Sequence, residues 1–232
     1  LSLMWIGLLL NSQSVFTDPV SAIIGAAAGY LVLLLVNSVY KLWKKQDGFG
    51  QGDYPLDEQA PTAPHTHYAI SKYAMECIAA NYRHELPLII SRPFNYTGPG
   101  QAVNFVIPKL VDHFARRASA VELGNLHVER EFNDVRMVCR VYRALLEKPM
   151  PGEVFNVCSG QPYTLQYVID VLSQLSHHKL EVRVNPAFVR ANEVHRLCGS
   201  PAKLIDAVGD LPFSPLNATL QWMLEEAQSQ LC

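Results

Sequence analysis

The pattern of apolar and polar positions changes in character near residue 50 of the chain. Between Val20 and Tyr40 only two serines and one asparagine interrupt an apolar run, which has about the length of a bilayer-spanning helix. Three lysines follow, at positions 41, 44 and 45, and predict that this end faces the cytoplasm. We therefore expect residues 20–40 to be a transmembrane helix, with the membrane as a binding partner of the chain. A buried core helix and a signal peptide are the alternatives, although a signal peptide carries its positive charges before the apolar run.

From residue 54 onward, segments with helical periodicity alternate with short apolar runs. The helical patterns are residues 67–85, 106–117, 135–147 and 165–176, and two more near 200–208 and 217–230. The strand patterns are residues 86–92, 120–124, 153–160 and 180–184. Residues 94–101 are rich in glycine and proline and are predicted to form a loop. Strands separated by helices predict an α/β architecture.

Charge and the spacing of cysteines and histidines argue against a nucleic-acid partner, a disulfide framework and a metal site. The formal net charge of −2 provides no field that would attract nucleic acid. Five cysteines occur without a Cys-x-x-Cys pair, which favours reduced thiols over a disulfide framework. Two histidine pairs, at 65 and 67 and at 177 and 178, lack a third ligand at metal-binding spacing, so no metal site is predicted.

The chemistry in the sequence begins with the segment YAISK, in which Tyr68 and Lys72 are four residues apart. On a helix both side chains project from the same face. An ammonium beside a phenol favours the phenolate, which makes the tyrosine a usable general acid or base near neutral pH. Taken alone, this spacing is equally typical of a solvated pair on a helix surface.

The segments around this pair carry a family resemblance. Residues 54–232 resemble the C-terminal part of an extended short-chain dehydrogenase/reductase of the NAD-dependent epimerase/dehydratase family, close to the GDP-4-keto-6-deoxymannose reductases and GDP-mannose 4,6-dehydratases. The matching segments are PLDEQAPTAPHTHYAISKYAME, SRPFNYTGPGQ, FVIPKL, REFNDVR, FNVCSGQ and VRANEVHRLCGSPAKL. The resemblance implies the C-terminal half of a Rossmann-like fold with a substrate-binding lobe. It also implies NADP or NAD as cofactor, a GDP-sugar as substrate, reduction at the sugar C4 ketone, and a homodimer built on the Tyr68 helix.

The resemblance also assigns roles to single residues. Tyr68 would donate the proton to the C4 ketone, and Lys72 would hold the nicotinamide ribose. Pro93 and Phe94 would border the nicotinamide, and Asn95, which could also be a turn residue, would face cofactor and substrate. The residues that would line the GDP-sugar site are Asn104, Val106, Lys109, Arg130 and Arg190. An arginine fork suits phosphate oxygens. For Arg130 a local salt bridge is the alternative, and for Arg190 a solvated loop position.

Three features depart from the family pattern. The chain contains no Gly-x-Gly-x-x-Gly turn, which such enzymes use to place a pyrophosphate at a helix N-terminus. Lys44 and Lys45 stand where the family has its catalytic serine or threonine, and Met137 stands where an acidic residue is common. We therefore expect the dinucleotide-binding half to be missing and catalysis by this chain to be impaired.

Residues 1–53 are similar instead to a fragment of the type IV prepilin leader peptidases, which are membrane aspartic proteases. The segments that carry this similarity are WIGLLLNS, AIIGAAAGYLVLLLVNSVYKL and GFGQGD. Asp53 would be one of two catalytic aspartates, and the other is expected upstream of Leu1. Pro55 stands where that family has a lysine, so peptidase activity is not expected.

These resemblances predict a chimera, formed by recombination or by an error in DNA assembly. Its parts are a membrane helical segment (1–46), a junction (47–53) and a partial epimerase/dehydratase-type domain (54–232). The domain is expected in the cytoplasm, anchored to the inner membrane if the first segment is genuine. A fragment of a nucleotide-sugar reductase is the leading functional hypothesis. The alternatives are a membrane-tethered GDP-sugar-binding module and a remnant of the peptidase.

Overall fold

Helices and strands alternate along residues 55–64, 66–148, 150–189, 194–209 and 213–231, the part of the chain that the computed structural model describes. All of these residues belong to one compact unit, residues 46–232. The predicted α/β architecture is confirmed. The transmembrane helix predicted for residues 20–40 and the predicted peptidase residue Asp53 lie outside the described residues. Within the described ranges, no helix has the length and hydropathy that a membrane crossing requires.

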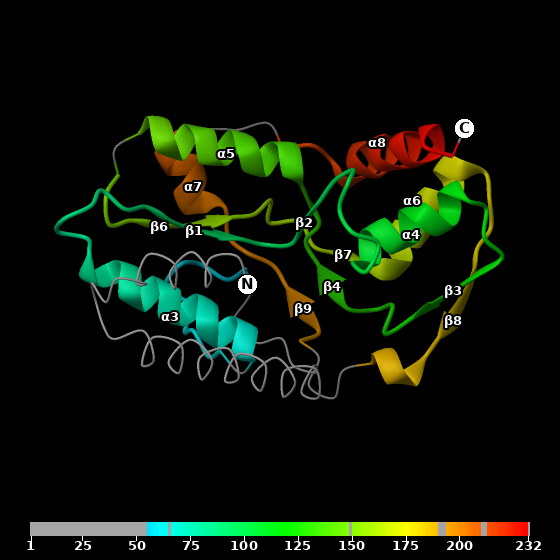
Figure 1. Cartoon of the computed structure of the whole chain (residues 1–232), viewed down its shortest axis with the longest axis horizontal. Coiled ribbons are helices and arrows are strands. Elements are labelled where there is room, and N and C mark those ends of the chain that lie inside the picture. The colour runs from blue at the N-terminus through cyan, green and yellow to red at the C-terminus, as the bar shows by residue number, and fades with distance from the viewer. Residues whose placement is uncertain (1–54, 65, 149, 190–193, 210–212, 232) are drawn as a thin grey trace, which may run out of the picture. The chain divides into compact units, whose positions relative to one another are not determined.

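The first group of elements is built on two parallel strands. β1 (Ile90–Pro93) pairs with β6 (Val154–Val157) over its whole length. Helices α5 (Val135–Glu147) and α7 (Ala202–Val208) lie on one side of this pair, and α3 (His67–Asn81) lies on the other (Figure 1). The core between the strands and α5 and α7 consists of Met137, Val138, Val141, Leu145, Phe155, Val157 and Leu204. We call these two strands and two helices the α5/α7 group.

The second group surrounds the parallel pair of β3 (Ala120–Leu123) and β8 (Glu181–Val184). Three helices pack together beside these strands: α4 (Val106–Ala115), α6 (Leu165–Ser176) and α8 (Leu216–Ser229) (Figure 1). Their amphipathic faces close a core in which Leu110, Phe114, Val168, Leu172 and Leu220 are completely buried. We call these two strands and three helices the α4/α6/α8 group.

Short strands connect the two groups. β2 (Tyr96–Thr97) pairs in parallel with β5 (Asn133–Asp134). β4 (Glu129–Arg130) lies between β7 (Tyr163–Thr164), which is antiparallel to it, and β9 (Arg196–Leu197), which is parallel. A short 3-10 turn, η1 (Pro186–Phe188), follows β8. The predicted loop at 94–101 therefore contains a strand, which two residues are too few to reveal by periodicity.

Helix α3 carries the Tyr68–Lys72 pair and is held to the rest of the unit by few contacts. Thr66 caps its N-terminus, because the hydroxyl accepts a hydrogen bond from the Ala69 N–H at 3.0 Å. Ala69 is its one buried residue, and Arg92 of β1 binds Glu76 at 2.7 Å. The helix was predicted to continue to residue 85, but it ends at Asn81, and turns follow. The homodimer predicted through this helix stays a prediction.

Candidate functional site

Tyr68 and Lys72 lie together on an open face of α3, as their spacing predicts. The Lys72 Nζ is 5.5 Å from the centroid of the Tyr68 ring. Tyr68 is 61% exposed, and Lys72 is exposed as well. The phenol and the ammonium can therefore both meet a bound molecule. Their roles in catalysis remain predictions.

The segment Pro93–Asn95 follows directly from β1. The Phe94 N–H donates to the Val157 carbonyl at 3.0 Å, which extends the pairing of β1 with β6. The Phe94 ring packs against Gly199, where a Cβ atom would lie only 2.6 Å from the Phe94 Cζ. The Asn95 carbonyl accepts hydrogen bonds from the backbone N–H of Asn133 at 2.9 Å and from its Nδ2 at 3.1 Å. This backbone is thus fixed by the protein on one side, while the Asn95 side chain is exposed.

A buried carboxylate that the sequence reasoning did not single out organises the turns behind this segment. Glu131 is 1% exposed. Its Oε2 accepts hydrogen bonds from the Ser159 N–H at 2.8 Å, the Ser159 hydroxyl at 3.1 Å and the Gly160 N–H at 3.3 Å. Its Oε1 accepts the Gly199 N–H at 2.6 Å. These partners are 28 and more residues away along the chain, so no local spacing could have revealed them.

Two buried thiols lie near this carboxylate. Burial, and then the charge of Glu131, raise the pKa of Cys198 to about 11. The same two causes raise the pKa of Cys158 further above its ordinary value. Since the thiolate is the reactive form of cysteine, both residues are inert at neutral pH. We therefore assign them to packing.

The described residues that were predicted to bind the GDP-sugar lie at the start of α4 and on β4. The Lys109 Nζ donates to the Glu122 carbonyl at 2.7 Å and lies 5.3 Å from the centroid of the exposed Phe188 ring. Arg130 donates from Nη1 to the carbonyls of Glu129 at 2.8 Å and His195 at 3.4 Å. Phe188 was not predicted, and its place two residues before Arg190 is the signal that could have found it.

The remaining predicted residues are at the start of α4 and in the segment before β9. Asn104 is exposed, and Val106 is the first residue of α4. No side chain caps this helix, so its first N–H groups are available to a ligand or to water. Arg190 lies outside the described residues, so its predicted contact with the GDP-sugar stays a prediction.

The side chain of Asp134 caps the N-terminus of α5. Its side chain accepts the Arg136 N–H at 2.7 Å, the Arg136 Nη2 at 2.6 Å and the Thr219 hydroxyl at 2.8 Å. Burial opposes ionisation, but the hydrogen bonds from Arg136 and Thr219 outweigh it and hold the pKa of this carboxyl below its ordinary value. The ionised carboxyl therefore stabilises the fold.

We expect the stability of the chain in acid to depend on Asp134. Its folded-state pKa lies below the unfolded-state value of about 4, so its contribution is complete above that pH and is lost as the pH falls through the folded-state pKa. Asp134→Asn should lower the free energy of unfolding at pH 7 by about 1–2 kcal/mol and should remove this part of the acid dependence. Urea unfolding between pH 2 and 7 measures both effects. Asp170→Asn, at an exposed position of α6, is the control, and parallel profiles for Asp134→Asn and the wild type would contradict the assignment.

The chain matches a known protein family over most of its length. The protein-family model described as GDP-mannose 4,6 dehydratase matches residues 47–210. The chain belongs to this family. The match includes the segment GFGQGD, and nothing in the comparisons supports the similarity of residues 1–53 to a peptidase.

Two relatives and one solved structure show the level of similarity. The chain is 34% identical to GDP-6-deoxy-D-talose 4-dehydrogenase of Aggregatibacter actinomycetemcomitans and 34% identical to GDP-6-deoxy-D-mannose reductase of Pseudomonas aeruginosa. Each alignment covers 76% of this chain and 60% of the relative, so the chain spans about 60% of the length of these relatives. The structure of RMD from Pseudomonas aeruginosa complexed with NADPH is 32% identical, with a TM-score of 0.74 over 80% of this chain and 65% of that one. The fold is thus of the Rossmann-like short-chain dehydrogenase/reductase type.

The Tyr68–Lys72 pair fits a nicotinamide dinucleotide. An exposed phenol and an exposed ammonium are side by side, and they offer hydrogen-bond donors to ribose hydroxyls and to a carbonyl oxygen. The Phe94 ring, by contrast, packs against Gly199 behind the same segment. The assignment of Tyr68 and Lys72 to the cofactor stays a prediction.

Proposed function

We propose that residues 54–232 form the sugar-nucleotide-binding and proton-donating part of an NAD(P)-dependent reductase that acts at the C4 ketone of a GDP-6-deoxyhexose. The observation that carries this proposal is the exposed Tyr68–Lys72 pair on α3, in a chain of the GDP-mannose 4,6 dehydratase family. The names of the two relatives support the GDP-6-deoxyhexose, and the NADPH complex of the solved neighbour supports the cofactor.

The proposed chemistry divides between the protein and the cofactor. When bound, the dinucleotide supplies a hydride to C4. The Tyr68 hydroxyl donates a proton to the C4 oxygen, so the carbonyl becomes an alcohol. The Lys72 ammonium stabilises the phenolate that remains and donates to the nicotinamide ribose. The exposed position of both groups is consistent with these roles.

The proposed GDP site uses cations beside an aromatic ring. Arg130 would bind the diphosphate, because a guanidinium matches phosphate oxygens in pairs. Lys109 and Phe188 would hold the base end of the nucleotide, with the ring as a flat surface on which a base can stack. Asn104, Val106 and Arg190 complete the predicted lining.

We further propose that the 232-residue chain binds GDP-sugars more readily than it turns them over. The phosphate-binding Gly-x-Gly-x-x-Gly turn that a dinucleotide needs does not occur in its sequence. A GDP-sugar-binding module that residues 20–40 tether to a membrane is the second candidate. Membrane fractionation of cells that express the full chain separates it from the first.

The experiment that tests the proposed function is calorimetry with the purified full chain and GDP. We expect saturable binding of one GDP per chain and no NADPH-dependent reduction of a GDP-4-keto-6-deoxyhexose. Arg130→Ala should weaken GDP binding about tenfold, because a charge-assisted hydrogen bond to phosphate is lost.

The matched control is Arg183→Ala. Arg183 is exposed and pairs with Glu181 on β8, so its loss should leave GDP affinity unchanged. Circular dichroism establishes that each variant is folded. Folded protein that releases no heat with GDP would refute the proposed site, and sustained turnover of NADPH would refute the proposed impairment.

A further inference from the structure

A carboxylate, an ammonium, an amide and an aromatic ring come together at the end of β3. Glu122 lies on β3, Lys109 on α4, and Asn185 and Phe188 in the turn that follows β8. Both neighbours of Glu122 on the strand are buried in the core, so its own side chain projects outward and is exposed. The Phe188 ring is 51% exposed. A ligand can therefore meet both the carboxylate and the ring.

Asn185 connects this carboxylate to the turn that carries Phe188. The Asn185 Nδ2 donates to the Glu122 Oε2 at 3.0 Å, and its Oδ1 accepts the Ala187 N–H at 2.9 Å. The Asn185 carbonyl accepts the Phe188 N–H at 2.9 Å. One residue thus holds the carboxylate beside the turn on which the ring is mounted.

Close packing joins the same turn to the end of β3. A Cβ atom at Gly124 would lie 2.7 Å from the Phe188 carbonyl oxygen, so glycine is needed for this approach. The Asn185 N–H also donates to the Leu123 carbonyl at 2.8 Å. The turn and the strand are therefore joined without a ligand, which lowers the cost of ordering them on binding.

Lys109 and Glu122 both have hydrogen-bonding capacity left for a ligand. The Lys109 Nζ donates to the Glu122 carbonyl at 2.7 Å and lies 5.3 Å from the centroid of the Phe188 ring. An ammonium has three N–H groups, so two remain for another acceptor. The Glu122 Oε1 accepts no hydrogen bond from a described residue. Donors and acceptors are thus both available beside the exposed ring.

This combination matches the hydrogen-bonding edge of guanine. That edge carries one acceptor, O6, followed by two adjacent donors, N1–H and the 2-amino group. An ionised carboxylate only accepts and can take two donors side by side, whereas an ammonium only donates. Adenine, cytosine and uracil have no two adjacent donors on this edge, so each would leave part of the carboxylate without a partner.

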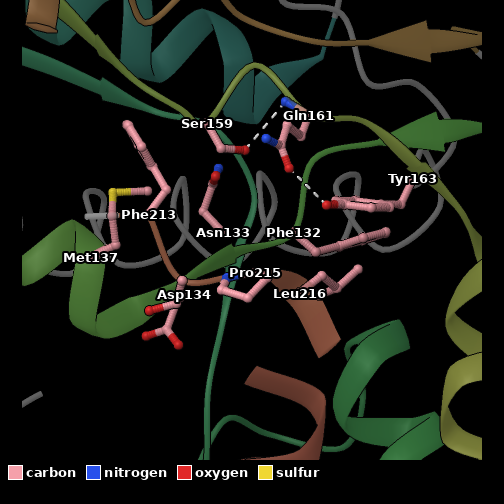
Figure 2. Close-up of a pocket in the computed structure, with 11 residues that line it drawn as sticks. Phe132, Asn133, Asp134, Met137, Ser159, Gln161, Tyr163, Phe213, Pro215 and Leu216 are labelled. Atoms are coloured by element: carbon pink, nitrogen blue, oxygen red, sulfur yellow. Dashed lines mark hydrogen bonds between the residues drawn. The ribbon is translucent and has the colours of Figure 1, made fainter. Parts of the chain in front are cut away.

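The pocket of about 110 Å³ in Figure 2 does not offer the same groups. Its wall comes from the start of α5, the segment after β6 and the start of α8. The carboxylate in that wall, Asp134, already binds Arg136 and Thr219. Among the described residues, the groups that suit a guanine edge are therefore those at the end of β3.

We propose that Glu122 determines the base specificity of the nucleotide site and selects guanine. The base stacks on Phe188, the carboxylate accepts N1–H and the 2-amino group, and the Lys109 ammonium donates to O6. This inference rests on the proposed function, which places the base end of the nucleotide at Lys109 and Phe188. It adds the residue that distinguishes guanine from other bases.

Calorimetry of the full chain with GDP, inosine diphosphate (IDP) and UDP tests the proposal. IDP differs from GDP only in lacking the 2-amino group, so it loses one hydrogen bond to the carboxylate. We expect the wild type to bind GDP roughly ten- to a hundredfold more tightly than IDP, because a hydrogen bond to a charged group is lost. UDP should bind no more tightly than IDP.

Glu122→Gln leaves an acceptor at one end of the side chain and places an amide nitrogen at the other. This variant should weaken GDP binding about tenfold and bring the affinities for GDP and IDP within about threefold of each other. Glu181→Gln is the matched control, since Glu181 is an exposed carboxylate on β8 that pairs with Arg183 at 2.9 Å. It should keep the GDP affinity and the preference of the wild type. Circular dichroism establishes that both variants are folded.

The outcomes separate this inference from the proposed function. Equal wild-type affinities for GDP and IDP, or an unchanged preference in Glu122→Gln, would overturn the role of Glu122 and leave the proposed GDP site standing. An equal loss of preference in Glu181→Gln would do the same. Folded wild-type protein that binds none of the three nucleotides would refute the proposed function and the inference together.

Discussion

Replacement of Glu131 by alanine is expected to lower the free energy of unfolding by about 3–5 kcal/mol. The carboxylate is 1% exposed and accepts the backbone N–H groups of Ser159, Gly160 and Gly199. Without it, several buried donors lose their acceptor, and each costs about 1–3 kcal/mol. Urea unfolding of the full chain, followed by far-ultraviolet circular dichroism, measures the loss.

A graded series distinguishes this cause from a general effect of losing charge. Glu131→Gln keeps one carbonyl oxygen and should cost about 1–3 kcal/mol, because its amide nitrogen would face groups that donate. Glu129→Ala is the matched control, since Glu129 pairs with the half-exposed Arg196 at 3.2 Å and should cost no more than about 1 kcal/mol. Equal losses for Glu131→Ala and Glu129→Ala would show that Glu131 does not organise these turns.

Gly199→Ala should destabilise the chain by about 2–3 kcal/mol and displace the Phe94 ring. A Cβ atom at this position would lie 2.6 Å from the Phe94 Cζ and 2.8 Å from the Cys158 Sγ. The Gly199 backbone cannot easily retreat, because its N–H is held by Glu131 at 2.6 Å. Urea unfolding measures the loss, and the aromatic NMR signals of Phe94 report the displacement.

The control for this substitution is Gly100→Ala. Gly100 has a φ of +80° with nothing within 4 Å of the added Cβ, so the cost of about 1 kcal/mol comes from backbone strain alone. The Phe94 signals should not move in this variant. Gly199→Ala with wild-type stability and an unmoved Phe94 ring would contradict the close packing described here.

The long helices could be predicted because each carries its own pattern. α5 and α6 begin and end at the predicted residues, since both are amphipathic over three turns or more. The pairing of Tyr68 with Lys72 followed in the same way from helical spacing. Information within one element was sufficient in these cases.

What could not be predicted depends on distant parts of the chain. The two-residue strands β2, β4, β5, β7 and β9 are too short to show a period, and their partners decide their existence. Glu131 looks like an ordinary charged residue until Ser159 and Gly199 are placed beside it.

The elements of the two helix groups alternate along the chain, and this order has a consequence for how the protein folds. Along the chain, the α5/α7 group receives β1, then α5 and β6, and then α7. The α4/α6/α8 group receives α4 and β3, then α6 and β8, and then α8, so the two groups alternate (Figure 1). Neither group is encoded by a continuous stretch. During synthesis from the N-terminus, the α5/α7 core therefore stays open until α7 has left the ribosome, and the α4/α6/α8 core until α8 has left it. A single cut in a loop between α5 and α7 would divide the residues of both cores.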